Sequence, residues 1–190
     1  MTELETRIIN IDVEFIRNKM KEINAINVKK ENQINNIFDF EDRRLLNNKG
    51  YARIRTVDDL INNKTIYFMT TKKMLSQEKF KVMDEKEVII SDSKIGEGIF
   101  KSLGLVLVES IKKYRESYKY KNSLIEIDIN DPSFCPFPYI EIETTNENEL
   151  EEIVNLLGYE MKDTTSKTIY QLIAENNQKD IENYSNLKGL

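Results

Sequence analysis

The chain of 190 residues contains no histidine, no tryptophan and a single cysteine. The absence of histidine excludes Ser-His-Asp and Cys-His triads, phosphohistidine chemistry and zinc sites with histidine ligands, because each needs an imidazole that works near neutral pH. Cys135 has no second thiol with which to form an internal disulfide, as is typical of proteins in a reducing cytosol. We therefore expect Cys135 to be inert.

Long apolar runs and a strong excess of positive charge are also lacking. Residues 1–5 carry acid where a signal peptide carries basic residues, and no apolar stretch is long enough to span a membrane. Lys+Arg number 28 and Asp+Glu number 33, and the resulting net charge of −5 argues against a general nucleic-acid-binding protein. These features predict a cytoplasmic protein with no membrane or nucleic-acid partner, and they leave the oligomeric state open.

Alternation of apolar and polar residues, with many β-branched and aromatic side chains, predicts a mainly β protein with flanking helices. The expected strands are Thr2–Asn10, Gln33–Phe40, Tyr51–Val57, Lys64–Lys72, Phe80–Ile90, Val106–Tyr120, Ser123–Asn130 and Tyr139–Thr144. The expected helices are Asp12–Ala25, capped by Asp12, Asp92–Leu103, ended by Gly104, and Glu147–Leu157, followed by Gly158.

The connections between these elements are short, and glycine is scarce. All three prolines lie in residues 131–138, which are therefore predicted to form a loop between two strands. No stretch has the composition of an interdomain linker, so we expect one domain over residues 1–175 and a tail over residues 176–190.

Charged residues repeat with a period of two in almost every predicted strand. Residues i and i+2 of a strand share a face, so Glu3, Glu5 and Arg7 project together. The same spacing relates the pairs Arg53 and Arg55, Glu85 and Glu87, Lys113 and Arg115, Glu126 and Asp128, and Glu141 and Glu143.

An open sheet would turn this charged face toward water, whereas a closed barrel would place it around a polar lumen. Buried charges are stable only when they are paired, so a lumen with both signs suits a ligand with both signs. A polyphosphate chelated to a divalent cation is such a ligand, because carboxylates bind Mg²⁺ or Mn²⁺ while Arg and Lys bind phosphate oxygens.

The order of these motifs resembles the CYTH domain, or triphosphate tunnel metalloenzymes, over residues 2–173. The resemblance rests on Glu3-x-Glu5-x-Arg7, Phe38-Asp39, Ala52-Arg53-Ile54-Arg55, Lys72, Glu85-x-Glu87, Lys113-x-Arg115, Asp128 and Glu141-x-Glu143. It implies an eight-stranded antiparallel closed barrel, a tunnel that binds triphosphate. Phe38 and Asp39 are interpreted as structural, with Asp39 fixing the following turn.

The resemblance also implies roles for individual residues. Divalent metal, Mg²⁺ or Mn²⁺, is assigned to Glu3, Glu5, Asp128, Glu141 and Glu143. The triphosphate is assigned to Arg7, Arg53, Arg55, Lys72, Lys113 and Arg115, with Lys73 as the alternative to Lys72. Glu85 and Glu87 are the catalytic candidates, which would order a second metal or the attacking water.

Two departures from the family pattern accompany the resemblance. Arg7 stands where the family usually has Lys, and Met83 and Thr168 stand where it often has basic residues, for which Lys81 and Lys167 are the candidate substitutes. The expected function is hydrolysis of tripolyphosphate or of a nucleoside or thiamine triphosphate. The alternatives are a class IV adenylate cyclase that forms cyclic AMP and pyrophosphate, and a non-catalytic module that binds polyphosphate or triphosphorylated ligands.

Overall fold

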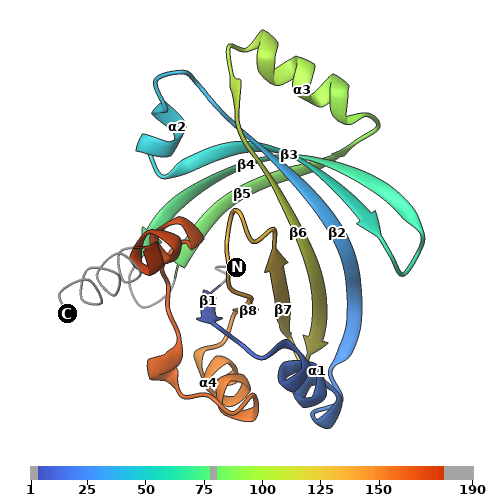
Figure 1. Ribbon diagram of the computed structural model, residues 1–190, viewed down its shortest axis with the longest axis vertical. Helices are drawn as coiled ribbons and strands as arrows, with labels where there is room; N and C mark the ends of the chain where they lie inside the picture. Colours follow the sequence, from blue (N-terminus) through green and yellow to red (C-terminus); the bar gives the residue numbers. More distant parts are fainter. Residues whose placement is uncertain (1–3, 78–80, 178–190) are drawn as a thin grey trace, which may run out of the picture.

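The computed structural model of the chain describes residues 4–77 and 81–177, and its eight strands form one curved sheet (Figure 1). The strands are β1 (Leu4–Ile9), β2 (Ile26–Asp39), β3 (Gly50–Asp59), β4 (Lys64–Gln77), β5 (Lys81–Ile90), β6 (Val106–Tyr120), β7 (Ser123–Asn130) and β8 (Tyr139–Thr144). The helices are α1 (Val13–Glu22), α2 (Arg44–Asn47), α3 (Ser93–Ser102), α4 (Glu147–Leu156) and the 3-10 helix η1 (Met161–Asp163), and residues 169–177 are also helical. Among the described residues, no helix is both long enough and apolar enough to cross a bilayer.

Neighbouring strands are antiparallel throughout, in the order β1-β5-β4-β3-β2-β6-β7-β8, and β8 pairs with β1. Seven of these junctions are ladders of several residues, whereas in the described part of β1 and β5 the two strands share only the pair Glu5 and Lys81. The mainly β class and the eight antiparallel strands are thus confirmed. The expected full closure of the barrel is met only in part, because the sheet is a curled half-barrel whose edge strands meet at one residue pair.

Beside β1 lies a segment that comes much later in the sequence, residues 164–168. Arg7 and Thr165 exchange two backbone hydrogen bonds of 2.9 Å. The Gln77 side chain at the end of β4 donates to the Ser166 carbonyl at 3.1 Å. We call residues 164–168 the C-terminal strap, because they connect β1 to β4 across the incomplete junction.

Helix caps predicted from the sequence are present. The carboxylate of Asp12 accepts from the Phe15 N–H at 3.0 Å, as predicted, and Asp92, for which no cap was predicted, accepts from the Lys94 N–H at 2.7 Å. Gly104 and Gly158 follow α3 and α4 with φ of 87° and 84°, a backbone conformation that favours glycine. These local signals place α1, α3 and α4 within three residues of their predicted ends.

Other boundaries differ from the prediction. β2 begins seven residues earlier than predicted, and its first residues are exposed on both faces, so that no alternation marks them. β4 continues five residues further, to Gln77, and α2, η1 and the helix over residues 169–177 were not predicted. The predicted ends at Thr2 and Phe80 and most of the predicted tail, residues 178–190, lie outside the described residues.

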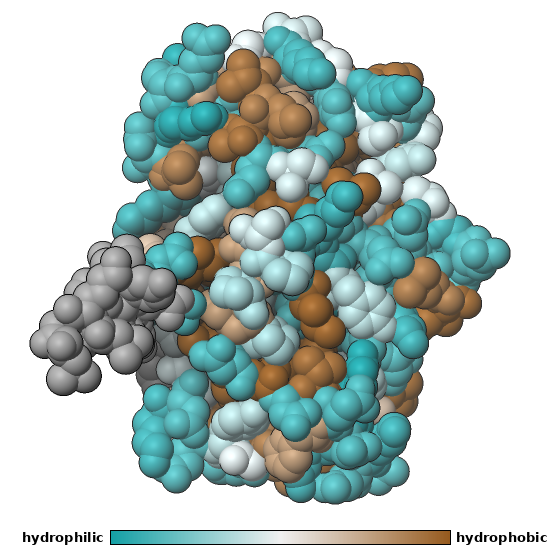
Figure 2. All heavy atoms as spheres, viewed as in Figure 1, coloured by the Kyte–Doolittle hydropathy of each residue, from teal (hydrophilic) through white to brown (hydrophobic). Residues whose placement is uncertain are grey.

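The helices α1, α3 and α4 pack on the convex side of the sheet. α1 and α4 cover one core, which includes Ile16 and Leu150, while α3 covers a second core through Phe100 (Figure 1). The outer surface mixes hydrophilic side chains with small apolar patches, one of them at the β3–β4 turn, where Leu60 and Ile61 are half-exposed (Figure 2). Since the alternate residues of each strand are used in these cores, the charged residues between them face the concave side.

Candidate functional site

The concave side of the sheet forms a cavity of about 720 Å³. Eleven of the thirteen site residues predicted from the sequence line it: Glu5, Arg7, Arg53, Arg55, Lys72, Glu85, Glu87, Lys113, Arg115, Glu141 and Glu143. Asp128 is completely buried beneath Lys113 and Arg115, with which it pairs, and Glu3 lies outside the described residues. The structure therefore brings residues from six strands together around one space.

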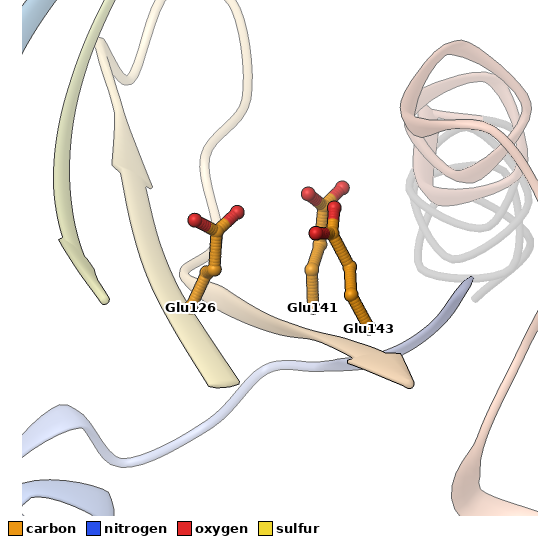
Figure 3. A group of neighbouring side chains, drawn as sticks. All are labelled: Glu126, Glu141 and Glu143. Atoms are coloured by element: carbon orange, nitrogen blue, oxygen red, sulfur yellow. The ribbon is translucent and has the colours of Figure 1, made fainter. Parts of the chain in front are cut away.

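Three carboxylates from β7 and β8 form an acidic cluster in this cavity. One oxygen each of Glu126, Glu141 and Glu143 lies within 4.8 Å of the other two, and the three side chains point into the same space (Figure 3). The alternation in β7 places Glu126 on the charged face, although Asp128 is the residue of that strand predicted to bind metal. The pairing of Glu126 with Glu141 across β7 and β8 is what joins it to the cluster.

Glu143 differs from the other two members of this acidic cluster. Its side chain has no ion pair or hydrogen bond within residues 4–77 and 81–177, whereas Glu126 and Glu141 both pair with Arg115. Burial raises the pKa of Glu143 to about 7, with further contributions from the negative charges of Glu126 and Glu141. A divalent cation bound here would remove this repulsion.

Arg115 connects the acidic cluster to Asp128. Its Nε and Nη2 donate to the two oxygens of Asp128 at 2.6 and 2.5 Å, and Nη2 also donates to Glu141 at 3.0 Å. Lys113 donates to Asp128 at 2.8 Å. Burial alone would raise the pKa of Asp128, but Arg115 and Lys113 lower it below its ordinary value. Asp128 is therefore an ionised anchor that fixes the orientation of two cations.

Arg7 lies on the opposite side of the same carboxylates. Its Nη2 donates to Glu5 and to Glu141, while Nη1 donates to the carbonyl of Lys167 in the C-terminal strap at 2.9 Å. Burial lowers the pKa of Arg7. The negative charges of Glu141 and Glu5 raise it again, so that the pKa lies above its ordinary value. Arg7 is thus held charged between the acidic cluster and the strap.

A second group of charges occupies β3, β4 and β5. Arg53 donates to Glu85 and Glu87 at 3.2 Å each, and Arg55 donates to both oxygens of Glu87 at 2.9 and 3.0 Å. The Lys72 ammonium lies 2.8 Å from Glu85. Burial lowers the pKa of Arg55, and the charge of Arg53 lowers it further. Three cations therefore surround two carboxylates, which leaves an excess of positive charge.

The register of β4 separates Lys72 from Lys73. Lys72 pairs with Tyr51 of β3 and lines the cavity, whereas Lys73 is exposed on the other face. Of the two candidate substitutes for missing basic residues, Lys167 pairs with Glu175 at 2.7 Å, and the side chain of Lys81 lies outside the described part of the chain.

The residues interpreted as structural behave as such. Phe38 is completely buried against Phe100, with ring centroids 5.4 Å apart. Asp39 accepts from the backbone N–H groups of Phe40, Leu45 and Leu46 at 2.7, 3.0 and 2.9 Å, and thereby fixes the turn into α2. Cys135 is 2% exposed, and its thiol donates to the Phe137 carbonyl at 3.3 Å.

Comparison with known proteins agrees with this arrangement. The family model of the CYTH domain matches residues 1–169. The chain belongs to the CYTH domain family. No curated protein matches the chain.

Solved structures share this CYTH fold. The PH1819 protein of Pyrococcus horikoshii is 25% identical, with a TM-score of 0.75, covering 92% of this chain and 99% of its own. A candidate adenylyl cyclase of Hippeastrum, described as having a dominant triphosphatase activity, is 18% identical, with a TM-score of 0.69 over 93% and 96% of the two chains. A candidate adenylate cyclase of Vibrio parahaemolyticus is 14% identical, with a TM-score of 0.72 over 92% and 98%.

The donor set of this CYTH chain fits a hard divalent cation. The three clustered groups are all carboxylates, which are the ligands that Mg²⁺ and Mn²⁺ prefer. Neither histidine nor a second cysteine is present to favour a softer metal.

Proposed function

We propose that the chain is a divalent-metal-dependent enzyme that hydrolyses triphosphates. The observation that carries this proposal is the juxtaposition, in one cavity, of a carboxylate cluster and six basic side chains from four strands. Carboxylates alone would bind only a cation and basic residues alone only an anion. Both together suit a metal-chelated triphosphate.

The proposed metal ligands are Glu126, Glu141 and Glu143, together with Glu5 and Glu3 from β1 and the residues before it. Asp128 supports them by holding Arg115 rather than by direct ligation, because both of its oxygens are already used by Arg115 and Lys113. Bound Mg²⁺ or Mn²⁺ would supply charge neutralisation at the phosphate oxygens.

The proposed triphosphate cradle consists of Arg7, Arg53, Arg55, Lys72, Lys113 and Arg115. Lys113 is paired with the buried Asp128, and each of the other five cations is paired with a carboxylate that lines the cavity. Phosphate binding would therefore exchange carboxylate oxygens for phosphate oxygens at preformed positions. Because these donors are fixed before the substrate arrives, they can stabilise charge that moves onto the leaving phosphate.

Glu85 and Glu87 are the proposed positioning and catalytic carboxylates. Burial raises the pKa of Glu85, but Lys72, Arg53 and Arg55 together lower it below its ordinary value, so this carboxylate is ionised at neutral pH. An ionised carboxylate beside the cradle can accept a hydrogen bond from a water and orient it toward the terminal phosphorus. No covalent protein intermediate is needed for this reaction.

We further propose that residues 1–175 act as one domain and that the tunnel is completed by the C-terminal strap. The strap is bonded to β1 through Thr165 and to β4 through Gln77, and it fills the junction that β5 leaves open. A completed wall would restrict bulk water during phosphoryl transfer.

Product analysis tests the function. The protein is incubated with Mg²⁺ or Mn²⁺ and with tripolyphosphate, ATP or thiamine triphosphate, and the products are separated. Release of phosphate would support the triphosphatase. Formation of cyclic AMP and pyrophosphate from ATP would instead support the adenylate cyclase alternative. Binding of these ligands without any product would support the non-catalytic binding module.

A further inference from the structure

Two cations line the cavity outside the proposed triphosphate cradle. Arg43 directly precedes the single-turn helix α2, and Lys49 directly precedes β3, so the two residues flank α2 at one end of the sheet (Figure 1). Arg43 is half-buried and Lys49 is exposed, which shows that the cavity meets solvent at this end. We call this pair of residues the α2 mouth.

The charges of the α2 mouth are not neutralised. Every cation of the cradle pairs with a carboxylate, whereas the side chains of Arg43 and Lys49 have no ion pair or hydrogen bond in the part of the chain that the structure describes. Acidic residues near α2 in the sequence have other roles. Asp39 holds backbone N–H groups of α2, Asp42 pairs with the first residue of α2 at 2.9 Å, and Glu41 does not line the cavity.

The backbone at both residues is in a conformation that costs stability. The φ angle is 58° at Arg43 and 57° at Lys49, in the left-handed region that glycine and asparagine adopt most readily. Among the other described non-glycine residues with positive φ, three are asparagines, and Lys121 pairs with Glu152 at 2.6 Å. A long cation with a strained backbone and no partner within the protein is typical of a side chain that meets a ligand.

The α2 mouth lies next to the cradle but not within it. Lys49, Tyr51 and Arg53 follow one another at alternate positions, and all three line the cavity. At the rise of a β-strand, Lys49 is about 13 Å from Arg53 along the chain. Over such a distance a charge attracts an anion through its long-range field, which is screened beyond about 30 Å at 0.01 M salt but beyond about 3 Å at 1 M.

We propose that Arg43 and Lys49 form the entrance through which a polyanionic phosphate chain reaches the cradle. This inference rests on the proposed triphosphatase function and specifies the end of the cavity at which the substrate enters. The chain as a whole has a net charge of −5 and repels a triphosphate, which stays anionic with one divalent cation bound. Unpaired cations at one mouth raise the local concentration of the anion there.

Hydrolysis of tripolyphosphate in Mg²⁺, measured at ionic strengths of about 0.01 M and about 1 M, tests the proposal. Arg43→Gln and Lys49→Gln are compared with wild type and with two controls that each remove one positive charge. Lys29→Gln alters a cation that also lines the cavity, but near the opposite end of β2 from α2. Lys121→Gln alters an exposed cation of the β6–β7 turn, which also has positive φ. Circular dichroism establishes that each variant is folded.

We expect Arg43→Gln and Lys49→Gln each to lower kcat/KM by roughly 3-fold at the lower ionic strength and by less than about 1.5-fold at the higher one, with kcat unchanged. Both controls should change by less than about 1.5-fold at either ionic strength. Calorimetric titration of the non-hydrolysable analogue diimidotriphosphate in Mg²⁺ should give the same pattern in Kd without relying on turnover.

Equal losses in Lys29→Gln or Lys121→Gln would indicate general attraction to positive charge and overturn the entrance. Unchanged values for both mouth variants, or a loss that persists at high salt or appears in kcat, would also overturn it while leaving the triphosphatase intact. If wild type binds diimidotriphosphate but does not hydrolyse tripolyphosphate, the triphosphatase fails and the calorimetric comparison still decides the entrance. Failure of wild type to bind the analogue would overturn both proposals.

Discussion

Glu143→Gln is expected to stabilise the metal-free protein at pH 8 while abolishing its response to divalent metal. The folded protein raises the pKa of Glu143 from 4.5 to about 7, because burial and two neighbouring carboxylates oppose its ionisation. The folded state thus holds this proton more tightly than the unfolded chain does. The free energy of unfolding therefore falls as the pH rises from about 4.5 to about 7, and the whole penalty is present above that range.

The size of the effect follows from this shift. One pKa unit corresponds to about 1.4 kcal/mol, so the displacement from 4.5 to about 7 sets an upper limit on the order of 3 kcal/mol. Partial exposure to the cavity reduces this to about 2 kcal/mol. For a chain of this length, a change of 1 kcal/mol in the free energy of unfolding moves the Tm by about 2–4 °C. The Glu143→Gln substitution should therefore raise the Tm at pH 8 by about 5 °C.

Thermal unfolding followed by circular dichroism measures this directly. Wild type, Glu143→Gln and the control Glu151→Gln, which alters an exposed carboxylate of α4, are compared at pH 5 and pH 8 with chelator or with Mn²⁺. The gain for Glu143→Gln should be smaller at pH 5, and Mn²⁺ should raise the Tm of wild type but not of this variant. A Glu143→Gln variant that is less stable than wild type at pH 8 without metal would refute the reasoning.

Three further predictions concern other residues of the site and its support. Glu141→Gln should reduce turnover at limiting metal by at least on the order of 10²-fold while the circular dichroism spectrum persists, and unchanged turnover would argue against a metal at the acidic cluster. Arg55→Gln should weaken binding of tripolyphosphate by on the order of 10-fold, and that of pyrophosphate by less, in calorimetry at fixed ionic strength; equal losses that vanish at high salt would indicate nonspecific attraction. Asp39→Ala should lower the free energy of unfolding by about 1–3 kcal/mol in urea denaturation, because three backbone N–H groups lose their acceptor, and an unchanged midpoint would contradict this role.

Much of the sheet could be predicted because its signals are local. β6, β7 and β8 begin and end at the predicted residues, since each combines strict alternation with a clear turn or proline-rich break. The same alternation placed eleven of the predicted site residues on one cavity wall. The alternation alone does not decide whether Lys72 or Lys73 faces the interior. That depends on how β4 pairs with β3, where Lys72 lies opposite Tyr51.

Features that depend on distant partners could not be predicted. The first half of β2 has no alternation, and it is a strand because it pairs with the long strand β6. α2 is a single turn whose N–H groups are held by Asp39, a residue of the preceding strand. The C-terminal strap pairs with Arg7, from which it is separated by most of the sequence, and no local sequence pattern predicts this contact.

A crystal structure with Mn²⁺ and diimidotriphosphate tests the central claim most directly. Anomalous scattering identifies the metal independently of the protein density, and the phosphate positions follow from the same crystal. We predict a Mn²⁺ peak among Glu126, Glu141 and Glu143, with the phosphate chain extending from it to Arg53, Arg55 and Arg115. Manganese bound elsewhere, or a triphosphate on the outer surface with the carboxylate pairs of the cavity unchanged, would contradict the proposed site.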